Sequence, residues 1–218
     1  MLDSVLRPLV DPPLNAAARL LARTGISPNA VTLAGVPLAI GAAASIAAQR
    51  YGLALALIAA NRILDGLDGP LARLRGRASD LGGYLDIVCD FVFYAAIPVG
   101  FGLAAQRNLL PAMLLLAAFI AAGTSFLAFA VIAAKRGLET AAQGAKSFYF
   151  SAGLAEGTET IVVFVLACLW PAAFPQIAYV YAAACVLTLA GRIILAWRTF
   201  GTGGRSDPSS PAPSRRTP

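Results

Sequence analysis

The sequence contains no histidine among its 218 residues, and this absence excludes several kinds of site at once. Without imidazole there is no histidine-ligated zinc, no Ser-His-Asp triad and no imidazole general base. Charged residues are also scarce, at 13% of the chain, whereas hydrophobic residues make up 58%. A soluble single domain of this length is far less apolar. Any chemistry must therefore use carboxylates, hydroxyls, Arg and Lys, or metal ions.

Cysteine is sparse as well. Cys89, Cys168 and Cys185 each lie inside an apolar run, and no two have Cys-x-x-Cys spacing. This spacing excludes the common thiol redox and zinc motifs, and we expect all three to be core residues.

A basic face with interleaved aromatic residues is absent too, although the net charge is +6. The Lys and Arg residues cluster beside apolar runs and near the C-terminus. This distribution does not indicate nucleic-acid binding, so we predict no nucleic-acid partner.

What the chain does contain is six apolar runs, each long enough to cross a ~30 Å hydrocarbon core as a helix of about 20 residues. We place them at about 28–49, 51–73, 84–105, 109–134, 153–170 and 174–197. The pattern predicts an all-α integral membrane protein with six transmembrane helices preceded by an interfacial amphipathic helix. Residues 1–199 would form this membrane domain, and the Gly-, Ser- and Pro-rich stretch 200–218 would be a disordered cytoplasmic tail.

The interfacial helix is expected at about 13–23, where the leucines are set apart from the arginines; a plain solvated helix is the alternative. Gly25 should end it. Ser27 is a candidate N-cap for the next helix, with Pro28 at the first helical position.

The basic residues predict the orientation of the spans. With six spans both termini share one side of the membrane, and thirteen Lys and Arg residues fall on that side or in its connections. The opposite side has Arg50 and Arg107 only. The positive-inside rule therefore places the termini, and the connections 74–83 and 135–152, in the cytoplasm, with the protein in the cytoplasmic (inner) membrane.

Four aspartates lie in or beside the apolar runs, where a carboxylate needs a partner or a purpose. Asp65 and Asp68 lie near the end of the second run, and Asp86 and Asp90 lie near the start of the third. The short connection 74–81 makes the two helices antiparallel neighbours, so the four carboxylates can converge.

Helical spacing places further residues on the same faces. At ~100° per residue, each aspartate pair shares one side of its helix with small or basic residues. These residues are Gly69, Ala72, Arg73 and Gly82.

Four converging carboxylates repel one another unless cations lie among them. Hard oxygen ligands suit Mg²⁺ or Mn²⁺, and four of them suffice for a two-metal site that holds a phosphoryl group. Arg73 adds a fork of donors for phosphate oxygens. The alternative is that the aspartates form helix-end salt bridges with nearby arginines, namely Arg62, Arg73, Arg75 and Arg77.

This segment resembles the signature of the CDP-alcohol phosphatidyltransferases, D-x-x-D-G-x-x-A-R-x(8)-G-x-x-x-D-x-x-x-D. It matches all eight fixed positions: Asp65, Asp68, Gly69, Ala72, Arg73, Gly82, Asp86 and Asp90. Eight fixed residues at fixed spacing make a specific motif. The stretch 27–32 also resembles the family's opening of its first span.

The resemblance implies an enzyme of phospholipid biosynthesis that transfers the phosphatidyl group of CDP-diacylglycerol to the hydroxyl of a small polar alcohol and releases CMP. It implies two Mg²⁺ or Mn²⁺ ions, membrane lipid around the protein, and a homodimer. The implied metal ligands are Asp65, Asp68, Asp86 and Asp90, of which Asp90 also accepts the proton of the attacking hydroxyl. The implied contacts to the CDP group are Gly69, Arg73, Ser79 and Asn29.

The acceptor alcohol is left open between glycerol 3-phosphate, serine, inositol, choline and others. Inositol phosphate is disfavoured because 125–128 and 153–160 contain alanine and acids where the family's inositol-phosphate branch has basic residues. Glu156 and Glu159 would bind an ammonium or hydroxyls, or pair with Lys146 and Arg192. Lys135, Arg136, Lys146 and Arg192 remain available to a phosphate.

Two other classes of protein compete with the enzyme. A divalent-cation transporter or channel predicts acids near the bilayer midplane and an inverted repeat. The DxxDG segment instead occurs once, and its acids lie at helix ends. A noncatalytic membrane scaffold would explain the spans but not the carboxylates.

Overall fold

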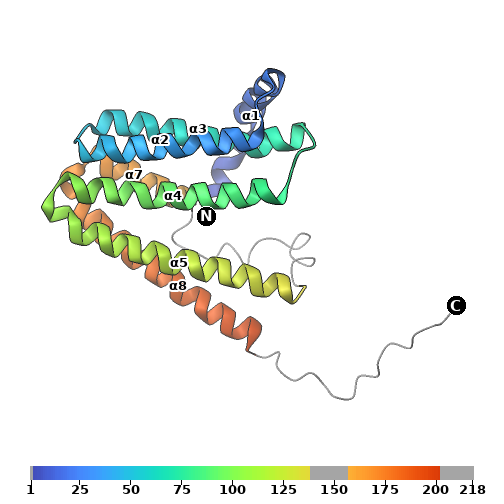
Figure 1. Cartoon of the computed structure of the whole chain (residues 1–218). Helices are drawn as coiled ribbons and strands as arrows, with labels where there is room; N and C mark the ends of the chain where they lie inside the picture. Colours follow the sequence, from blue (N-terminus) through green and yellow to red (C-terminus); the bar gives the residue numbers. More distant parts are fainter. Residues whose placement is uncertain (1, 138–156, 202–218) are drawn as a thin grey trace, which may run out of the picture.

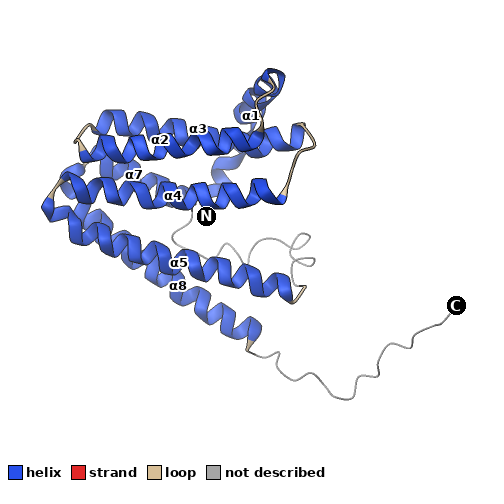
Figure 2. Ribbon diagram, in the orientation of Figure 1, coloured by secondary structure: helices blue, strands red, loops and turns tan. Residues whose placement is uncertain are grey.

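The computed structural model describes residues 2–137 and 157–201, with side chains from residue 11 onward, and these residues form helices joined by short connections (Figures 1 and 2). The long helices are α1 (Leu2–Leu21), α2 (Pro28–Ala47), α3 (Tyr51–Leu74), α4 (Asp80–Ala104), α5 (Leu109–Lys135), α7 (Gly157–Leu169) and α8 (Phe174–Phe200). Three single 3-10 turns are η1 (Ala22–Thr24), η2 (Gln106–Asn108) and η3 (Pro171–Ala173). The predicted all-α class is confirmed for this part of the chain.

The helices pack as two groups that meet along α4. Helix α2 packs against both α3 and α4, and α5 packs against α8 and α4 (Figure 1). Aromatic rings fill the space between the groups, since Phe93, Phe101, Phe164 and Phe174 are fully buried. Phe101 of α4 stacks on Phe174 of α8 with ring centroids 4.2 Å apart. One apolar core therefore fixes α4, on which half of the predicted site lies.

Four segments are long and apolar enough to cross a membrane: Pro28–Ala47, Asp80–Ala104, Gln106–Lys135 and Pro171–Phe200. Large apolar side chains such as Leu103, Val180 and Trp197 are exposed on them, as expected of a lipid-facing surface. The protein is thus an integral membrane protein, and four of the six predicted spans are supported.

The two remaining predicted spans differ from that pattern for separate reasons. Helix α3 has 24 residues, but Arg62, Asp65 and Asp68 interrupt its apolar sequence. Helix α7 has 13 residues in the described part of the chain. Residues 153–156 of its predicted span lie outside the described residues, as does 202–218 of the predicted tail. The count of six stays a prediction.

Helix α1 begins at Leu2, whereas we expected its start near residue 13. Proline favours the first turn of a helix, but Pro12 and Pro13 lie inside α1 at exposed positions, where solvent can satisfy the carbonyls that lose a donor. Ala18 is fully buried and packs with Leu67 and Leu71 of α3. The helix that was predicted at 13–23 is therefore confirmed but is longer, and one side of it is docked on α3.

The connection into α2 follows the sequence signals. Gly25 has φ +83°, a left-handed conformation that ends η1 as predicted. Ser27 caps α2, because its Oγ accepts a hydrogen bond from the Ala30 amide at 3.2 Å. Pro28 is the first helical residue. These contacts define where α2 begins.

The α3–α4 connection is shorter than predicted. Helix α4 begins at Asp80, where we expected it near residue 84, because Ser79 Oγ accepts a hydrogen bond from the Gly82 amide at 3.1 Å and caps the helix. Arg75 donates to the backbone carbonyls of Ala22 and Ile26, at 2.6 Å each. The connection is therefore tied to the turn between α1 and α2.

Candidate active site

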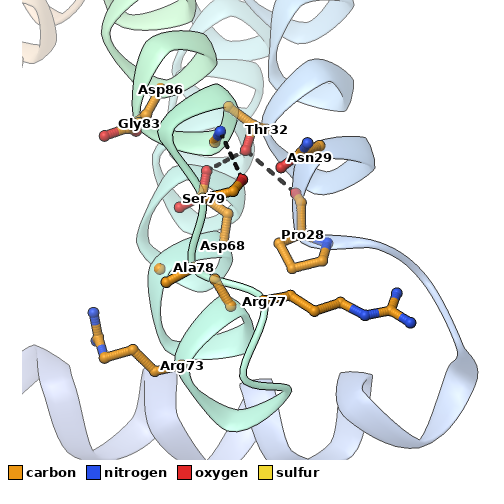
Figure 3. Close-up of a pocket in the computed structure, with 13 residues that line it drawn as sticks. Pro28, Asn29, Thr32, Asp68, Arg73, Arg77, Ala78, Ser79, Gly83 and Asp86 are labelled. Carbon is orange, nitrogen blue, oxygen red and sulfur yellow. Dashed lines mark hydrogen bonds between the residues drawn. The ribbon is translucent and has the colours of Figure 1, made fainter.

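A pocket of about 270 Å³ lies where the start of α2, the end of α3 and the start of α4 meet (Figure 3). Its walls combine carboxylates, arginines, hydroxyls and glycines. The lining residues are Pro28, Asn29, Thr32, Asp68, Gly69, Ala72, Arg73, Arg77, Ala78, Ser79, Gly82, Gly83 and Asp86. A cavity with this mixture suits a polar, negatively charged ligand.

Asp68 is held in the inner wall of the pocket by α2. It is buried, and its Oδ2 accepts a hydrogen bond from Thr32 Oγ1 at 2.5 Å. Thr32 Oγ1 also lies 3.2 Å from the carbonyl oxygen of Pro28, one turn earlier in α2 (Figure 3). The orientation of this carboxylate therefore depends on the first turn of α2, which Ser27 caps.

Glycines keep the opposite wall open. A Cβ atom on Gly82 would lie 3.4 Å from both Asn29 Oδ1 and Ser79 Oγ. Gly83 also lines the pocket, and a Cβ atom there would meet nothing within 4 Å. A side chain at position 82 would project toward Asn29 of α2, where the pocket lies.

Arg73 and Arg77 form the outer, basic part of the pocket. Both are exposed, and in Figure 3 they extend on opposite sides of the outer end. Over the described ranges, neither guanidinium makes an ion pair within 4.0 Å, so both remain available to a ligand. Guanidinium groups that are free to donate several hydrogen bonds suit phosphate oxygens.

Asp65 and Asp90 lie behind the pocket and do not line it. Arg62 Nη1 donates to Asp90 Oδ1 at 2.8 Å and lies 3.4 Å from Asp65 Oδ2. The helix-end alternative, in which arginines pair with the aspartates, thus holds for Arg62. It does not hold for Arg75, which binds backbone carbonyls.

The four carboxylates nevertheless form one electrostatic unit. Asp65 lies within interaction range of Asp68, Asp86 and Asp90, and Asp86 lies within range of Asp68 and Asp90. In the described part of the chain, Arg62 is the cation that lies within 4.0 Å of these carboxylates, at Asp65 and Asp90. Four mutually repelling carboxylates with one arginine favour the binding of further cations.

The chemistry of the four candidate ligands fits hard divalent cations. In this structure, however, carboxylates of the cluster are held by hydrogen bonds from other side chains. All four candidate ligands are carboxylates, the class that Mg²⁺ and Mn²⁺ prefer. In residues 11–137 and 157–201, no three Asp, Glu, Cys or His side chains are grouped closely enough to ligate one ion. Thr32 holds Asp68 by a hydrogen bond, and Arg62 holds Asp90.

The structure brings together most residues that we expected at the site. Six line the pocket, namely Asn29, Asp68, Gly69, Arg73, Ser79 and Asp86. Thr32 and Arg77 were not expected to line the pocket, and the pairing of Arg62 with the aspartates was expected only as part of the salt-bridge alternative. Arg77 lies in the connection after α3 ends at Leu74, so helical spacing gave no signal for it. Spacing also gave no reason to choose Arg62 over the other arginines.

The polar residues considered for the acceptor lie on other helices. Arg192 of α8 donates to the Ala122 carbonyl at 3.0 Å, and its guanidinium lies 5.4 Å from the Phe126 ring centroid. Arg136 donates to the Phe200 carbonyl at 3.1 Å. Both therefore have partners within the protein. Lys146 and Glu156 lie outside the described residues.

Known proteins resemble this chain over most of its length. The sequence profile named CDP-alcohol phosphatidyltransferase matches residues 25–200. The inner membrane protein YnjF of Escherichia coli (strain K12) is 47% identical over 194 residues, which cover 88% of this chain and 94% of YnjF. Phosphatidylinositol phosphate synthase of Mycobacterium marinum is 25% identical over 206 residues, covering 90% of this chain and 85% of that protein.

The fold also matches solved structures. Phosphatidylinositol phosphate synthase of Mycobacterium tuberculosis with CDP-DAG bound has a TM-score of 0.63 and 22% identity, over 84% of this chain and 93% of that one. The same enzyme in complex with manganese and citrate has a TM-score of 0.62 and 24% identity, over 84% and 88%. At these identities the likeness concerns the fold.

The family match covers residues 25–200, which include α3 and α4 with the four aspartates and the apolar core around them. It therefore decides between the enzyme, the transporter and the noncatalytic scaffold. A transporter and a noncatalytic scaffold are set aside. The chain belongs to the CDP-alcohol phosphatidyltransferase family, whose members are membrane enzymes of phospholipid synthesis.

Proposed function

We propose that this protein transfers the phosphatidyl group of CDP-diacylglycerol to the hydroxyl of a small polar alcohol and releases CMP. The observation that carries the proposal is the pocket, which combines Asp68 and Asp86 with Arg73 and Arg77 at one end of the helix bundle. A site at this end suits a donor whose nucleotide is in water while its acyl chains stay in lipid. The distribution of basic residues supports a cytoplasmic site.

The proposed metal ligands are Asp65, Asp68, Asp86 and Asp90. When bound, two Mg²⁺ or Mn²⁺ ions would neutralise the oxygens of the transferred phosphate and stabilise the departing CMP phosphate. The manganese in the solved M. tuberculosis structure, at 24% identity, supports a divalent ion in a fold of this kind. Asp68 and Asp86, which line the pocket, would contact the ions from opposite helices.

The nucleotide end of the donor would occupy the outer part of the pocket. Arg73 and Arg77 would donate hydrogen bonds to its phosphates, and Gly69 lets the backbone of α3 approach them. Asn29 and Ser79 lie on either side of Gly82 and would contact the nucleotide. The glycine at 82 leaves the space between them for the ligand.

Asp90 is the proposed proton acceptor for the attacking hydroxyl. The chain has no histidine, so a carboxylate is the natural general base. Its hydrogen bond from Arg62 at 2.8 Å fixes one carboxylate oxygen and leaves the other available. Asp90 lies one helical turn beyond Asp86, on the inner side of the pocket and close to where the transferred phosphate would lie.

The acceptor is proposed to be a small polar alcohol other than inositol phosphate. The related synthases from mycobacteria and from the archaeon Pyrococcus horikoshii are named for inositol phosphate lipids, the archaeal one at 38% identity over 46% of this chain. In this chain, however, Ser125 and Ala128 occupy α5 where cations would be needed, and Arg192 already contacts Ala122 and Phe126.

The proposal is tested by measuring CMP release from CDP-diacylglycerol by the purified full-length protein, with Mn²⁺ and a panel of alcohols. The panel contains glycerol 3-phosphate, serine, inositol, choline and inositol 1-phosphate. We expect alcohol-dependent CMP release that stops in Asp86→Asn, with inositol 1-phosphate among the poor acceptors. Release that is absent with every alcohol, from folded protein, would contradict the proposed reaction.

A further inference from the structure

Arg62 is built into the carboxylate cluster. Its Nη1 contacts Asp90 at 2.8 Å and Asp65 at 3.4 Å, so a single guanidinium joins α3 to α4. The Arg62 side chain is only 13% exposed, compared with 30% for Asp65 and 29% for Asp90. A half-buried ion pair of this kind is screened less by salt than a surface pair.

Two further contacts fix the guanidinium. Arg62 Nε donates to Asn61 Oδ1 at 2.8 Å, and buried Asn61 in turn donates to the Gly35 carbonyl of α2 at 2.8 Å. The guanidinium carbon lies 4.0 Å from the centroid of the fully buried Phe93 ring. The ring face and the amide thus hold the arginine in place from two directions.

This arrangement makes the two halves of the cluster unequal. Asp68 and Asp86 face the pocket, whereas Asp65 and Asp90 do not line it and share the Arg62 cation. Within the described residues, a divalent ion approaching the first pair meets two carboxylates that no arginine pairs with, because Arg73 and Arg77 line the same pocket without an ion pair to either one. An ion approaching the second pair must compete with a positive charge that is already hydrogen-bonded there.

We propose that Arg62 is an internal counter-ion and positioning residue that restrains Asp65 and Asp90, so that divalent cations load the two halves of the site unequally. The first ion binds on the Asp68 and Asp86 side. The second binds more weakly, because Arg62 must give up part of its contact with Asp65 or Asp90. This inference rests on the proposed metal site.

The test is a calorimetric Mn²⁺ titration of the full-length protein in detergent, with four proteins compared. They are the wild type, Arg62→Gln, Arg62→Lys and the control Arg50→Gln. Arg50 is exposed and directly precedes the first residue of α3, at the end of that helix that lies away from the aspartates. Its substitution therefore removes one positive charge at a distance from the cluster. Melting temperatures are measured in EDTA and in saturating Mn²⁺ for each protein.

We expect two unequal binding steps in the wild type and in Arg50→Gln. Arg62→Gln should strengthen the weaker step by about tenfold, because a unit positive charge next to the ligands is removed. Arg62→Lys keeps the positive charge but loses the forked set of guanidinium donors. Its affinity for the second Mn²⁺ ion should therefore lie between those of the wild type and Arg62→Gln. Arg62→Gln should also melt earlier in EDTA, with Mn²⁺ recovering most of the loss.

The other outcomes overturn the inference in distinguishable ways. If Arg62 only packs, Arg62→Gln lowers both melting temperatures equally and leaves both Mn²⁺ affinities unchanged. If Arg62→Gln cannot be purified, Arg62→Lys is the test. The inference is then overturned if Arg62→Lys does not bind the second Mn²⁺ ion more tightly than the wild type does. A wild type that binds no Mn²⁺ overturns the proposed metal site together with this inference.

Discussion

The two ends of helix α4 use the same kind of residue for opposite purposes. Near its C-terminus, a Cβ on Gly100 would lie 2.6 Å from the Ala43 carbonyl oxygen, because α2 and α4 are in backbone contact there. Near its N-terminus, a Cβ on Gly83 would meet nothing within 4 Å, and the pocket opens beside it. One glycine permits close packing and the other leaves room for a ligand.

The difference extends to the surrounding side chains. Around Gly100 the neighbours are fully buried apolar residues, Ile97 and Phe101, the second stacked on Phe174. Around Gly83 they are exposed or hydrogen-bonded polar groups such as Ser79 and Asp86. A rigid apolar end can therefore hold the helices in register while the polar end keeps four like charges close together.

Removal of divalent cations should have the largest effect, and it should act on the polar end alone. Exhaustive EDTA treatment is expected to abolish CMP release, because Arg62 pairs with Asp65 and Asp90 but leaves the two pocket aspartates without a cation between them and the donor phosphate. Mg²⁺ or Mn²⁺ should restore it. The measurement is turnover before and after metal is returned, with helical content followed by circular dichroism. Full activity in EDTA would end the two-metal account.

Substitutions at Asp86 and Asp90 should separate two roles within the polar end. Asp90→Asn keeps the shape but cannot accept a proton, so turnover should fall by about 10²–10⁴ while Mn²⁺ still binds. Asp86→Asn should lose both turnover and Mn²⁺ affinity, since an amide is a weaker ligand.

The matched control is Asp80→Asn, an exposed acid in the first turn of α4 that does not line the pocket. It should leave both quantities unchanged. Calorimetry and turnover decide the matter: if Asp90→Asn loses metal as completely as Asp86→Asn, Asp90 is primarily a ligand.

Gly100→Ala tests the apolar end. The added methyl group would overlap the backbone of α2, so we expect a loss of about 1–3 kcal/mol in stability from forced repacking. Gly52→Ala is the control, because a Cβ there meets nothing within 4 Å. Thermal unfolding in detergent measures the effect. Turnover per folded molecule should change little, and a large loss of turnover without loss of stability would show that the two ends are coupled.

Cys89→Ala should have the smallest effect. Cys89 precedes Asp90, and it is half-buried, whereas Cys168 and Cys185 are buried as predicted. The expectation that all three are core residues is wrong for Cys89, which is only partly buried. Near wild-type turnover is expected; a loss of several orders of magnitude in folded protein would implicate the thiol.

The sequence predicted the parts of the site that depend on local spacing. Ser27 and Gly25 were recognisable because caps and left-handed glycines act within a few residues. The convergence of Asp68 and Asp86 in one pocket followed from helical periodicity and a short connection. These features require no knowledge of how distant helices cross.

Features that depend on tertiary contacts could not be predicted in this way. Arg62, Arg73, Arg75 and Arg77 look alike in sequence, and only the packing of Phe93 beneath Arg62 singles it out. The hydrogen bond between Thr32 and Asp68 joins residues 36 positions apart. The start of α1 was missed because propensity disfavours Pro12 and Pro13 inside a helix.

The most direct test of the central claim is an anomalous-scattering map, recorded at the manganese edge, of the protein crystallised with Mn²⁺ and CDP-diacylglycerol. We expect two peaks about 3.5–4 Å apart between α3 and α4. They should be bounded by the carboxylates of Asp65, Asp68, Asp86 and Asp90, with the donor phosphates on the side of Arg73. Peaks elsewhere, or none in the presence of bound donor, would contradict it.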